Sequence, residues 1–592
     1  MKIGLKELPY YEKWIIAGFL IGVISGITIT LFYFTTELFS ILILRTISGI
    51  EPPKAFGDVA SLSLPLPRGY IYLLPLSVGL GGLMVGIILY FIPEIKGSGT
   101  DYSISAYHNS KEIKWYIAPI KLVASSLTLG SGGSAGDEGP SAVISASIGN
   151  SLTRRLGLPL EDSRRAIAIG IGTGIGIVFK SPIAGALLSA EILYRRDLEP
   201  DVIFPSLISA STGYVIYGYF TGYEPLLGFY NLPFDPLRLP IYAIMGVISG
   251  ILSIFYVKSF RWVKETFSKV PLWISPTIGG IIMGGIGILF PEVIGKGYGW
   301  IDLAEFQDLT KFSSSSPLPF ILILLFLPFA KIIATDLTVG SGGSGGIFAP
   351  GLVIGAFAGL DLGLIFNKIT PTVVPYVAPV VVIGMVSFLA GSVKVPLSAI
   401  ILVTEITDSI QLLPGTMIAV AISYIVSGRY SLIEGLPESR KESPVHSAEF
   451  EVPLLEKIRV RECHLDETSV REDDQIERVL RITKEKGLRS VPVTDDNNNF
   501  VGVIYTRNLK RGRKVRDFVI KGVPVISPDS SLEHAWEVMV ASRSTSVPVV
   551  DGGKLMGTLT FTSMLDRYKE REEEVFKGPD KSDKEENSKH ES

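Results

Sequence analysis

The stretch Lys121–Pro140 reads KLVASSLTLGSGGSAGDEGP, and it recurs at Lys331–Pro350 as KIIATDLTVGSGGSGGIFAP. The two copies align over 20 residues at an offset of 210 without a gap, and both contain a GSGGS core. A match of this length between apolar, glycine-rich segments indicates an internal duplication. The chain therefore contains two copies of one structural unit, and this duplication decides the fold.

Two further motifs extend the duplication in the same order. PEIKGSG at 93–99 matches PEVIGKG at 291–297. KSP at 180–182 and KVP at 394–396 are each followed by a glutamate nine residues after the proline. The two glutamates are Glu191 and Glu405.

We predict two membrane halves, 14–220 and 240–436, joined by a linker at 221–239. Several apolar stretches in both halves exceed the roughly 20 residues that span a bilayer. Others are shorter or are interrupted by Gly and Pro, as in helices that stop inside the membrane. An odd number of spans in each half would invert the halves and place a site between them near the midplane. The expected fold is a multi-pass α-helical membrane protein built from two repeated halves, and the duplication alone leaves open whether the halves are parallel or inverted.

Composition and charge limit the class of protein and its location. Of the 592 residues, 47% are hydrophobic, the net charge is −3 and the chain has one cysteine. These values give no basis for nucleic-acid binding and exclude an intramolecular disulfide. Residues 1–13 contain three lysines and no signal-peptide pattern, and basic doublets at 154–155, 164–165 and 195–196 flank apolar runs. We expect a protein of the cell membrane with a cytosolic N-terminus and a cytosolic C-terminal domain.

The duplicated glycine loops favour an anion as the bound species. A helix N-terminus presents unpaired backbone N–H groups and the positive end of its dipole, and glycines let the backbone approach a ligand closely. Several broken helices meeting at one point would form an anion site without a full positive charge. Ser98 would add a hydroxyl donor. One isolated GSGGS segment is explained by close helix packing, but a matched pair followed by proline at the same offset favours the anion site.

The two copies differ immediately after the shared core. Copy one continues as GDEGP at 136–140, and copy two continues as GIFAP at 346–350. An ionisable side chain at membrane depth is costly and indicates function. A carboxylate beside N–H donors can occupy an anion site itself and leave it when protonated, so we predict that Glu138 is a proton-sensitive gate. The alternative is a first-turn glutamate that only stabilises the helix dipole.

These motifs resemble those of the CLC family of chloride channels and chloride/proton exchangers, across the whole apolar region. That family carries G-S-G-I-P, G-R-E-G-P and G-x-F-x-P around a central chloride site. The third motif is intact here at 346–350, whereas the first reads GSGTD at 97–101 and the second has Asp137 in place of arginine. The resemblance implies chloride as the substrate, Glu138 as the external gate, and two inverted-repeat halves whose broken helices meet at the midplane. It also implies a homodimer with one pore in each subunit.

The resemblance also implies which residues bind chloride. They contribute hydroxyl or backbone N–H donors and are Ser98, Gly99, Gly346, Ile347, Phe348 and Tyr430. Tyr430 stands where the family supplies a tyrosine hydroxyl and an inner gate, and the alternative is an interfacial aromatic at a helix end. Lys121 is expected either to raise anion occupancy electrostatically or to snorkel to an interface.

Two departures from the family bear on gating and on proton coupling. Asp137 adds a carboxylate beside the gate, and like-charge repulsion would favour the protonated form of Glu138 if the two lie close together. Family exchangers carry an internal glutamate where this chain has Ile192, while Glu191 and Glu405 are expected to be buried structural groups. We therefore expect channel-like or weakly proton-coupled chloride transport, with coupled chloride/proton exchange as the alternative.

The C-terminal region contains a second duplication. SVPV occurs at 490–493 and at 546–549, and each copy is followed by a short β-rich run. Amphipathic helices are predicted at 475–486 and 532–541. This pattern resembles a tandem CBS-domain pair, which we place at 455–570.

CBS pairs often bind adenine nucleotides. The candidate nucleotide-binding positions are Tyr505, Asn508, Thr560 and Ser563. Both copies lack the aspartate that holds the ribose in the family pattern, so a structural or dimer-contact role competes with nucleotide binding, and no cofactor is required for transport. A linker at 437–454 precedes the pair, and a charged tail at 571–592 is predicted to be disordered.

Two other function classes fit the sequence poorly. A membrane metalloprotease would need an H-E-x-x-H motif, but the five histidines are scattered, and we expect no enzymatic activity. A CBS-bearing divalent-cation transporter would need clustered membrane carboxylates, whereas Glu138, Glu191 and Glu405 are widely separated in sequence.

Overall fold

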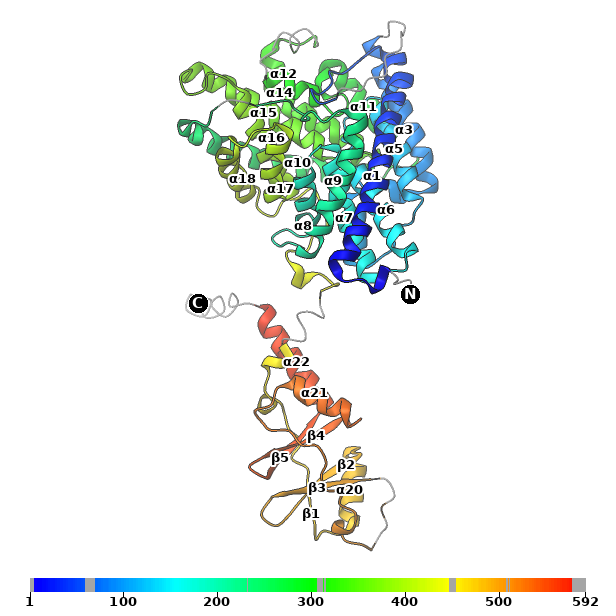
Figure 1. Ribbon diagram of the computed structural model, residues 1–592, viewed down its shortest axis with the longest axis vertical. Helices are drawn as coiled ribbons and strands as arrows, with labels where there is room; N and C mark the ends of the chain where they lie inside the picture. Colours follow the sequence, from blue (N-terminus) through cyan, green and yellow to red (C-terminus); the bar gives the residue numbers. More distant parts are fainter. Residues whose placement is uncertain are drawn as a thin grey trace, which may run out of the picture. The chain divides into compact units, whose positions relative to one another are not determined.

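The chain divides into two compact units, Met1–Val445 and His446–Ser592. The computed structural model describes residues 5–58, 70–230, 233–305, 312, 316–446, 454–506, 509 and 512–577. Unit 1 is helical and unit 2 combines short strands with helices (Figure 1). The division falls inside the predicted linker, and the first part of that linker packs on unit 1, where the backbone N–H of Arg195 bonds to the carbonyl of Pro437 at 3.0 Å.

Unit 1 contains two halves whose helices follow one another in matching order. Half one comprises α1 (Tyr10–Phe39), a π-helical turn at Ser40–Arg45, α2 (Thr46–Ser48), α3 (Leu74–Phe91), α4 (Thr100–His108), α5 (Ile117–Gly130), α6 (Glu138–Arg155), α7 (Leu160–Val178), α8 (Pro182–Glu191) and α9 (Ile203–Thr221). Half two comprises α10 (Leu239–Phe267), α11 (Ser275–Leu289), α12 (Tyr298–Glu305), α14 (Phe320–Thr335), a π-helical turn at Asp336–Gly340, α15 (Phe348–Ile369), α16 (Ala378–Val393), α17 (Pro396–Ile406) and α18 (Leu413–Ser427). Short 3₁₀ turns at Pro93–Ile95 and Pro291–Val293 precede α4 and α12.

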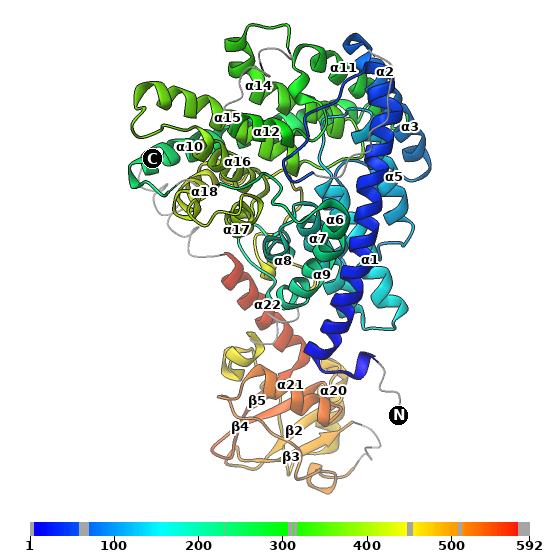
Figure 2. The same ribbon diagram turned by 45° about the horizontal axis from the view of Figure 1, so that its top comes forward.

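Helix length separates spanning helices from broken ones. Within the described residues, five helical segments are long and apolar enough to cross a membrane. They are Tyr10–Ser48, Ile71–Phe91, Pro236–Phe267, Phe320–Gly340 and Phe348–Ile369. Other apolar helices, such as α8 and α17, are too short to span a bilayer. The predicted mixture of complete and interrupted helices is confirmed, and α1 runs along one flank of unit 1 for its full length (Figures 1 and 2).

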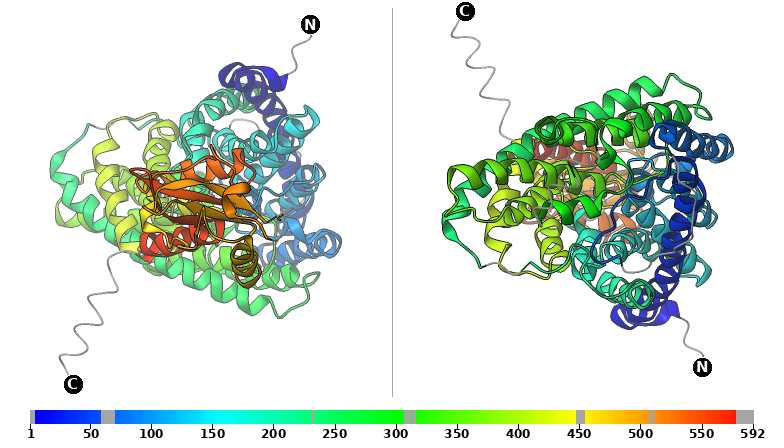
Figure 3. Two further views of the ribbon diagram at one scale, coloured as in Figure 1. Left: turned by 90° about the horizontal axis from the view of Figure 1, so that it is seen from below. Right: turned by 90° about the horizontal axis from the view of Figure 1, so that it is seen from above.

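The two halves meet through their equivalent glycine loops. Gly136 and Gly346, which are 210 residues apart, form an antiparallel bridge. The backbone N–H of Gly136 donates to the Gly346 carbonyl at 2.8 Å, and the reverse bond is 2.6 Å. Two equivalent residues that exchange both hydrogen bonds are related by a local two-fold axis, as expected for inverted halves. Seen from its two ends, unit 1 shows half one in blue to cyan beside half two in green to yellow (Figure 3).

Two glutamates also follow this symmetry, Glu191, which is buried as expected, and Glu405, which is only partly buried. Glu191, the last residue of α8, accepts hydrogen bonds from the backbone N–H groups of Leu397 and Ser398 in α17, at 2.8 and 2.7 Å. Glu405, near the end of α17, accepts from the backbone N–H groups of Ile183 and Ala184 in α8, at 3.0 and 2.8 Å. Each carboxylate therefore caps the exposed N–H groups of the other half's helix.

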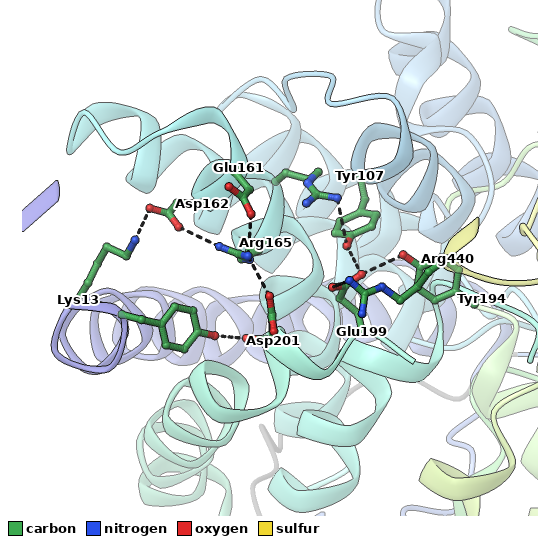
Figure 4. A network of polar contacts seen from close by, with 11 residues as sticks. Lys13, Tyr107, Glu161, Asp162, Arg165, Tyr194, Glu199, Asp201 and Arg440 are labelled. Atoms are coloured by element: carbon green, nitrogen blue, oxygen red, sulfur yellow. Dashed lines mark hydrogen bonds and ion pairs between the residues drawn. The ribbon is translucent and has the colours of Figure 1, made fainter. Parts of the chain in front are cut away.

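An ion-pair network fixes the start of α1 to the rest of unit 1. Lys13 pairs with Asp162 of α7 at 2.5 Å, and Arg165 of the same helix pairs with Asp201 at 2.9 Å (Figure 4). Beside these pairs, the buried carboxylate of Glu199 accepts hydrogen bonds from two tyrosine hydroxyls, at 2.7 and 2.9 Å. Because each buried charge has a partner, this end of the unit is held by specific contacts as well as by apolar packing.

Unit 2 contains two small sheets and several short helices. Its elements are β1 (Val470–Arg471), α20 (Ile476–Lys486), β2 (Ser490–Thr494), β3 (Phe500–Tyr505), α21 (Leu532–Ala541), β4 (Ser546–Asp551), β5 (Lys554–Thr560) and α22 (Phe561–Lys577). β2 pairs antiparallel with β3, and β4 pairs antiparallel with β5, so the two SVPV repeats form equivalent hairpins. Both predicted amphipathic helices are present, while α22 extends into the segment that we expected to be disordered from residue 571.

We predict that the reciprocal caps are required for stability. Glu191→Ala or Glu405→Ala leaves two backbone N–H groups of the opposite helix without their acceptor, which costs about 1–3 kcal/mol for each cap. The midpoint of thermal unfolding in detergent is therefore expected to fall by a few degrees. Glu265→Ala, on an exposed position of α10, serves as the control. Equal midpoints for all three variants and the parent would contradict the capping role.

We also predict low reactivity for the single cysteine. Burial raises the pKa of the Cys463 thiol in unit 2 from 9.0 to about 11. Since the thiolate is the reactive species, a pKa raised by about two units leaves roughly 100-fold less thiolate near pH 8. Alkylation by iodoacetamide at pH 8, followed by mass spectrometry, should be at least about 100-fold slower in the folded protein than in urea. Similar rates in the two conditions would show that the thiol is not buried.

Candidate anion site

The N-termini of two helices from opposite halves meet at the Gly136–Gly346 bridge. Glu138 is the first residue of α6 and Phe348 is the first residue of α15, and both side chains are buried. The first-turn N–H groups of a helix have no partner inside the helix, and the dipole adds partial positive charge at the same end. The junction is therefore suited to an anion, and the backbone N–H groups of Ile347 and Phe348 belong to it.

The Glu138 carboxylate occupies this junction. Its Oε2 accepts a hydrogen bond from the backbone N–H of Ala349, in the first turn of α15, at 3.2 Å. Its Oε1 accepts a hydrogen bond from the hydroxyl of Tyr298, and the backbone N–H of Glu138 also faces the carboxylate. A simple first-turn glutamate would interact with its own helix only. Here the negative group is held by donors from both halves, as a bound anion would be.

Two glycines make this geometry possible. A Cβ on Gly136 would collide with Glu138 Oε2, and a Cβ on Gly139 would collide with the hydroxyl oxygen of Ser98. The carboxylate and the hydroxyl therefore lie against bare backbone on either side of the start of α6. The spacing G-x-x-G around Glu138 follows from these two close approaches.

Ser98 and Gly99 bring a third helix N-terminus to the site. The Ser98 hydroxyl lies 2.9 Å from that of Thr100, the first residue of α4. Gly99 has a φ of 78°, in the left-handed region that favours glycine. The Cβ position of Gly139 is 3.0 Å from Gly346 Cα and touches Ser98. Of the predicted chloride-binding residues, those in the three loops are therefore brought together.

Lys121 and Lys331 hold the loops before α4 and α12. Lys121 Nζ donates to the carbonyls of Ile95 and Gly97 at 2.9 and 2.6 Å, and Lys331 Nζ makes the equivalent bonds to Val293 and Gly295 at 3.0 and 2.9 Å. Both side chains are fully buried, so of the two alternatives for Lys121, the one in which it snorkels to an interface is wrong. Lys121 Nζ also lies 3.4 Å from the Cβ position of Gly99, which places its charge beside the site.

Asp137 does not act as an isolated negative charge beside the gate. It forms an ion pair with Lys296, and the Asp137 side chain is 6% exposed. The prediction of simple like-charge repulsion omitted this partner, which lies 159 residues further along the chain. The sequence did contain one signal for this lysine. Lys296, in PEVIGKG at 291–297, occupies the place that Ser98 has in PEIKGSG at 93–99. Tyr298, two residues later, was also missed.

The structure does not bring Tyr430 to the central loops through any contact that it describes. The Tyr430 ring lies under Lys258 Nζ, 5.2 Å from the ring centroid, and its backbone N–H bonds to the carbonyl of Ser427 at 3.1 Å. A chloride-binding or gating role for Tyr430 remains a prediction. Ile192, at the position of the absent internal glutamate, directly follows α8 and is buried.

The predicted nucleotide-binding residues lie in unit 2. Tyr505 lines a narrow cleft between the two hairpins, with a volume of about 30 Å³, which holds a water molecule or two and is far smaller than a typical ligand pocket. The Ser563 hydroxyl donates to the carbonyl of His464, and the Thr560 hydroxyl accepts from the backbone N–H of Ser563 at 3.2 Å. Asn508 lies outside the described residues.

The match to a known family covers more than half of the chain. Residues 81–428 match the family described as Voltage gated chloride channel, and 460–513 and 515–570 each match the CBS domain. The chain belongs to the voltage-gated chloride channel, or CLC, family. Its membrane unit has the CLC fold, a tandem CBS pair follows, and the protein mediates CLC-type chloride transport across a membrane.

Several known proteins are similar to parts or most of this chain. An uncharacterized protein of Methanocaldococcus jannaschii is 29% identical over 67% of this chain and 88% of its own length. Chloride channel protein CLC-e of Arabidopsis thaliana is 26% identical over 97% and 78%. The H⁺/Cl⁻ exchange transporter ClcA of Citrobacter koseri is 29% identical over 57% and 72%. Both a named channel and a named exchanger are therefore among the relatives.

Solved structures confirm the fold. A slow cyanobacterial Cl⁻/H⁺ antiporter superposes with a TM-score of 0.59 at 22% identity, covering 76% of this chain and 99% of its own. A eukaryotic CLC transporter gives a TM-score of 0.56 at 18% identity and covers 93% of this chain and 97% of its own. The inverted-repeat architecture implied by the family resemblance is therefore confirmed.

Proposed function

We propose that the protein transports chloride through a pathway gated by Glu138, with channel-like or weakly proton-coupled transport. The observation that carries the proposal is the position of the Glu138 carboxylate, which accepts the Ala349 backbone N–H at the start of α15. A chloride ion favours the same donors. When Glu138 is ionised, the carboxylate and chloride compete for one site, and protonation weakens the hold of these donors on the side chain.

The absence of a carboxylate at residue 192 favours channel-like transport over coupled exchange. Ile192 is buried at the end of α8 and cannot carry a proton. The adjacent Glu191 accepts three hydrogen bonds from α17, including one from the Ser398 hydroxyl at 2.6 Å, and is committed to that cap. Coupled chloride/proton exchange is the second candidate, and the exchangers among its relatives and structural neighbours favour it.

The proposed function also includes how the protein assembles, where its termini lie and what the CBS pair does. We infer a homodimer in the cell membrane with the N-terminus and the CBS pair in the cytosol, supported by the family pattern and by the basic doublets at 154–155, 164–165 and 195–196. The narrow cleft in unit 2 and the engaged hydroxyl of Ser563 support a structural or dimer-contact role for the CBS pair over nucleotide binding. Transport, and not catalysis, is the activity proposed.

The gate is tested with Glu138→Gln in lipid vesicles loaded with chloride. The amide carries no charge at any pH, so chloride efflux should lose its pH dependence and remain at the level that the parent reaches in acid. Glu94→Gln, an exposed position before α4, should retain the parent profile. If efflux through the Glu138→Gln variant still follows pH as in the parent, the gate has been assigned to the wrong residue.

Proton coupling is tested on the same vesicles with a pH-sensitive dye inside and an imposed chloride gradient. We expect chloride flux with little or no uphill proton movement. Sustained uphill proton movement driven by chloride would instead establish the exchanger.

The hydroxyl of Tyr298 is expected to hold the gate closed. Tyr298→Phe removes one donor from the ionised carboxylate, and a hydrogen bond to a charged group contributes about 1.5–3 kcal/mol. Chloride efflux at neutral pH should therefore rise about tenfold or more. In the Glu138→Gln background the same substitution should change efflux less than about twofold, because the neutral amide gains little from this donor. An equal increase in both backgrounds would mean that Tyr298 acts elsewhere in the pathway.

A further inference from the structure

The end of the loop before α12 and the first residue of α12 make two adjacent polar contacts with the start of α6. Lys296 pairs with Asp137, and Tyr298 donates to Glu138. Half two therefore presents a cation and a hydroxyl to two consecutive carboxylates of half one. The equivalent loop of half one carries Ser98 in place of Lys296, and the equivalent helix start of half two has no carboxylate. The charged contacts are thus confined to one side of the local two-fold axis.

A cavity adjoins these contacts and gives the pair access to small polar species. Its volume is about 120 Å³. Its charged and hydroxylic lining includes Tyr33, Glu37, Arg45, Lys54, Asp58 and Lys296. The Lys296 side chain is 22% exposed, whereas that of Asp137 is 6% exposed. Lys296 therefore lies at the boundary between the cavity and the buried gate.

We propose that Asp137 and Lys296 form a charge-balancing pair that sets the pH at which the Glu138 gate opens. The inference rests on the proposed role of Glu138 and adds a positioning function for two residues that do not bind the transported ion. Asp137 alone would disfavour a second negative charge on the next residue, and Lys296 alone would favour it. Together they leave the ionisation of Glu138 governed by its own hydrogen bonds.

Other charged groups face the pair, and each has a partner of its own or a fixed position. Asp58 lies near both Lys296 and Asp137. Lys54 and Glu37, which also line the cavity, pair at 3.0 Å. Two tyrosines, Tyr33 of α1 and Tyr217 of α9, also lie near Lys296.

Two more charged groups lie near Asp58. Lys180 donates to the carbonyls of Gly57 and Gly222, each at 2.8 Å. Asp302 of α12 accepts the backbone N–H of Phe56 at 2.6 Å. Substitutions at 137 and 296 leave all these groups in place. The groups therefore do not change the direction in which each substitution is expected to shift the pH dependence of efflux.

Single and double substitutions separate this role from simple structural support. In Lys296→Met, Asp137 is unbalanced beside the gate, Glu138 keeps its proton to higher pH, and the midpoint of the efflux–pH curve should rise by about one unit or more. In Asp137→Asn, the negative charge beside Glu138 is removed while Lys296 keeps its positive charge, and the midpoint should fall by a similar amount. The double variant should return to within about 0.3 units of the parent, since both effects are removed. Lys296→Arg, which keeps the charge, should retain the parent midpoint.

The outcomes are distinct. Shifts in the same direction for both single variants, no shift in Asp137→Asn, or a double variant that does not return toward the parent would each overturn the inference. Asp137→Asn keeps the test decisive if Lys296→Met fails to fold, because Lys296 retains access to the cavity. In the Glu138→Gln background all three substitutions should leave a flat pH profile. If Glu138→Gln itself still responds to pH, the gate proposal fails, whereas a flat Glu138→Gln profile with unshifted single variants refutes the charge-balancing pair alone.

Discussion

The reciprocal backbone pairing of Gly136 and Gly346 is the constraint on which the site depends. Two hydrogen bonds between equivalent residues place the local two-fold axis between the glycine loops. Helices α6 and α15 start two residues later, so their N-termini are forced to lie close together. The first-turn N–H groups of α6 and α15 have no backbone acceptor within their own helices. The junction needs an external acceptor, and in this structure the acceptor is the carboxylate of Glu138.

This arrangement explains how an anion can be bound in an apolar unit without an unpaired lysine at its centre. Lys121 and Lys331 are buried beside the loops, yet each ammonium group donates to two backbone carbonyls. Their hydrogen bonds fix the loop geometry. The donors available to an anion are the backbone N–H groups at three helix N-termini, where the helix dipoles add partial positive charge. A weak, distributed attraction suits transport, because an ion that is bound by a full unbalanced charge would leave slowly.

Much of this could be predicted from the sequence because it depends on local backbone chemistry. Repeated GSGGS loops, a shared proline and equal spacings indicated two halves, and the glycine-rich loops indicated close backbone approach. The residues that were missed, Lys296 and Tyr298, act on partners about 160 residues away. Their importance depends on how α12 is placed against α6, which no local pattern specifies. The reciprocal caps of Glu191 and Glu405 fall between these cases, since their equal spacing indicated a shared structural role but not the partner helix.

The duplication also shows how symmetry is retained where it supports the fold and lost where it controls the ion. Lys121 and Lys331, Gly136 and Gly346, and the two capping glutamates make the same contacts in both halves. At the site itself, by contrast, the equivalent positions differ. Asp137 and Glu138 of half one correspond to Ile347 and Phe348 of half two, and Ser98 corresponds to Lys296. A fully symmetric site would have either two carboxylate gates or none. Divergence at these few positions gives the site one side with charged groups and one neutral side made of backbone donors and hydroxyls, without disturbing the contacts that hold the two halves together.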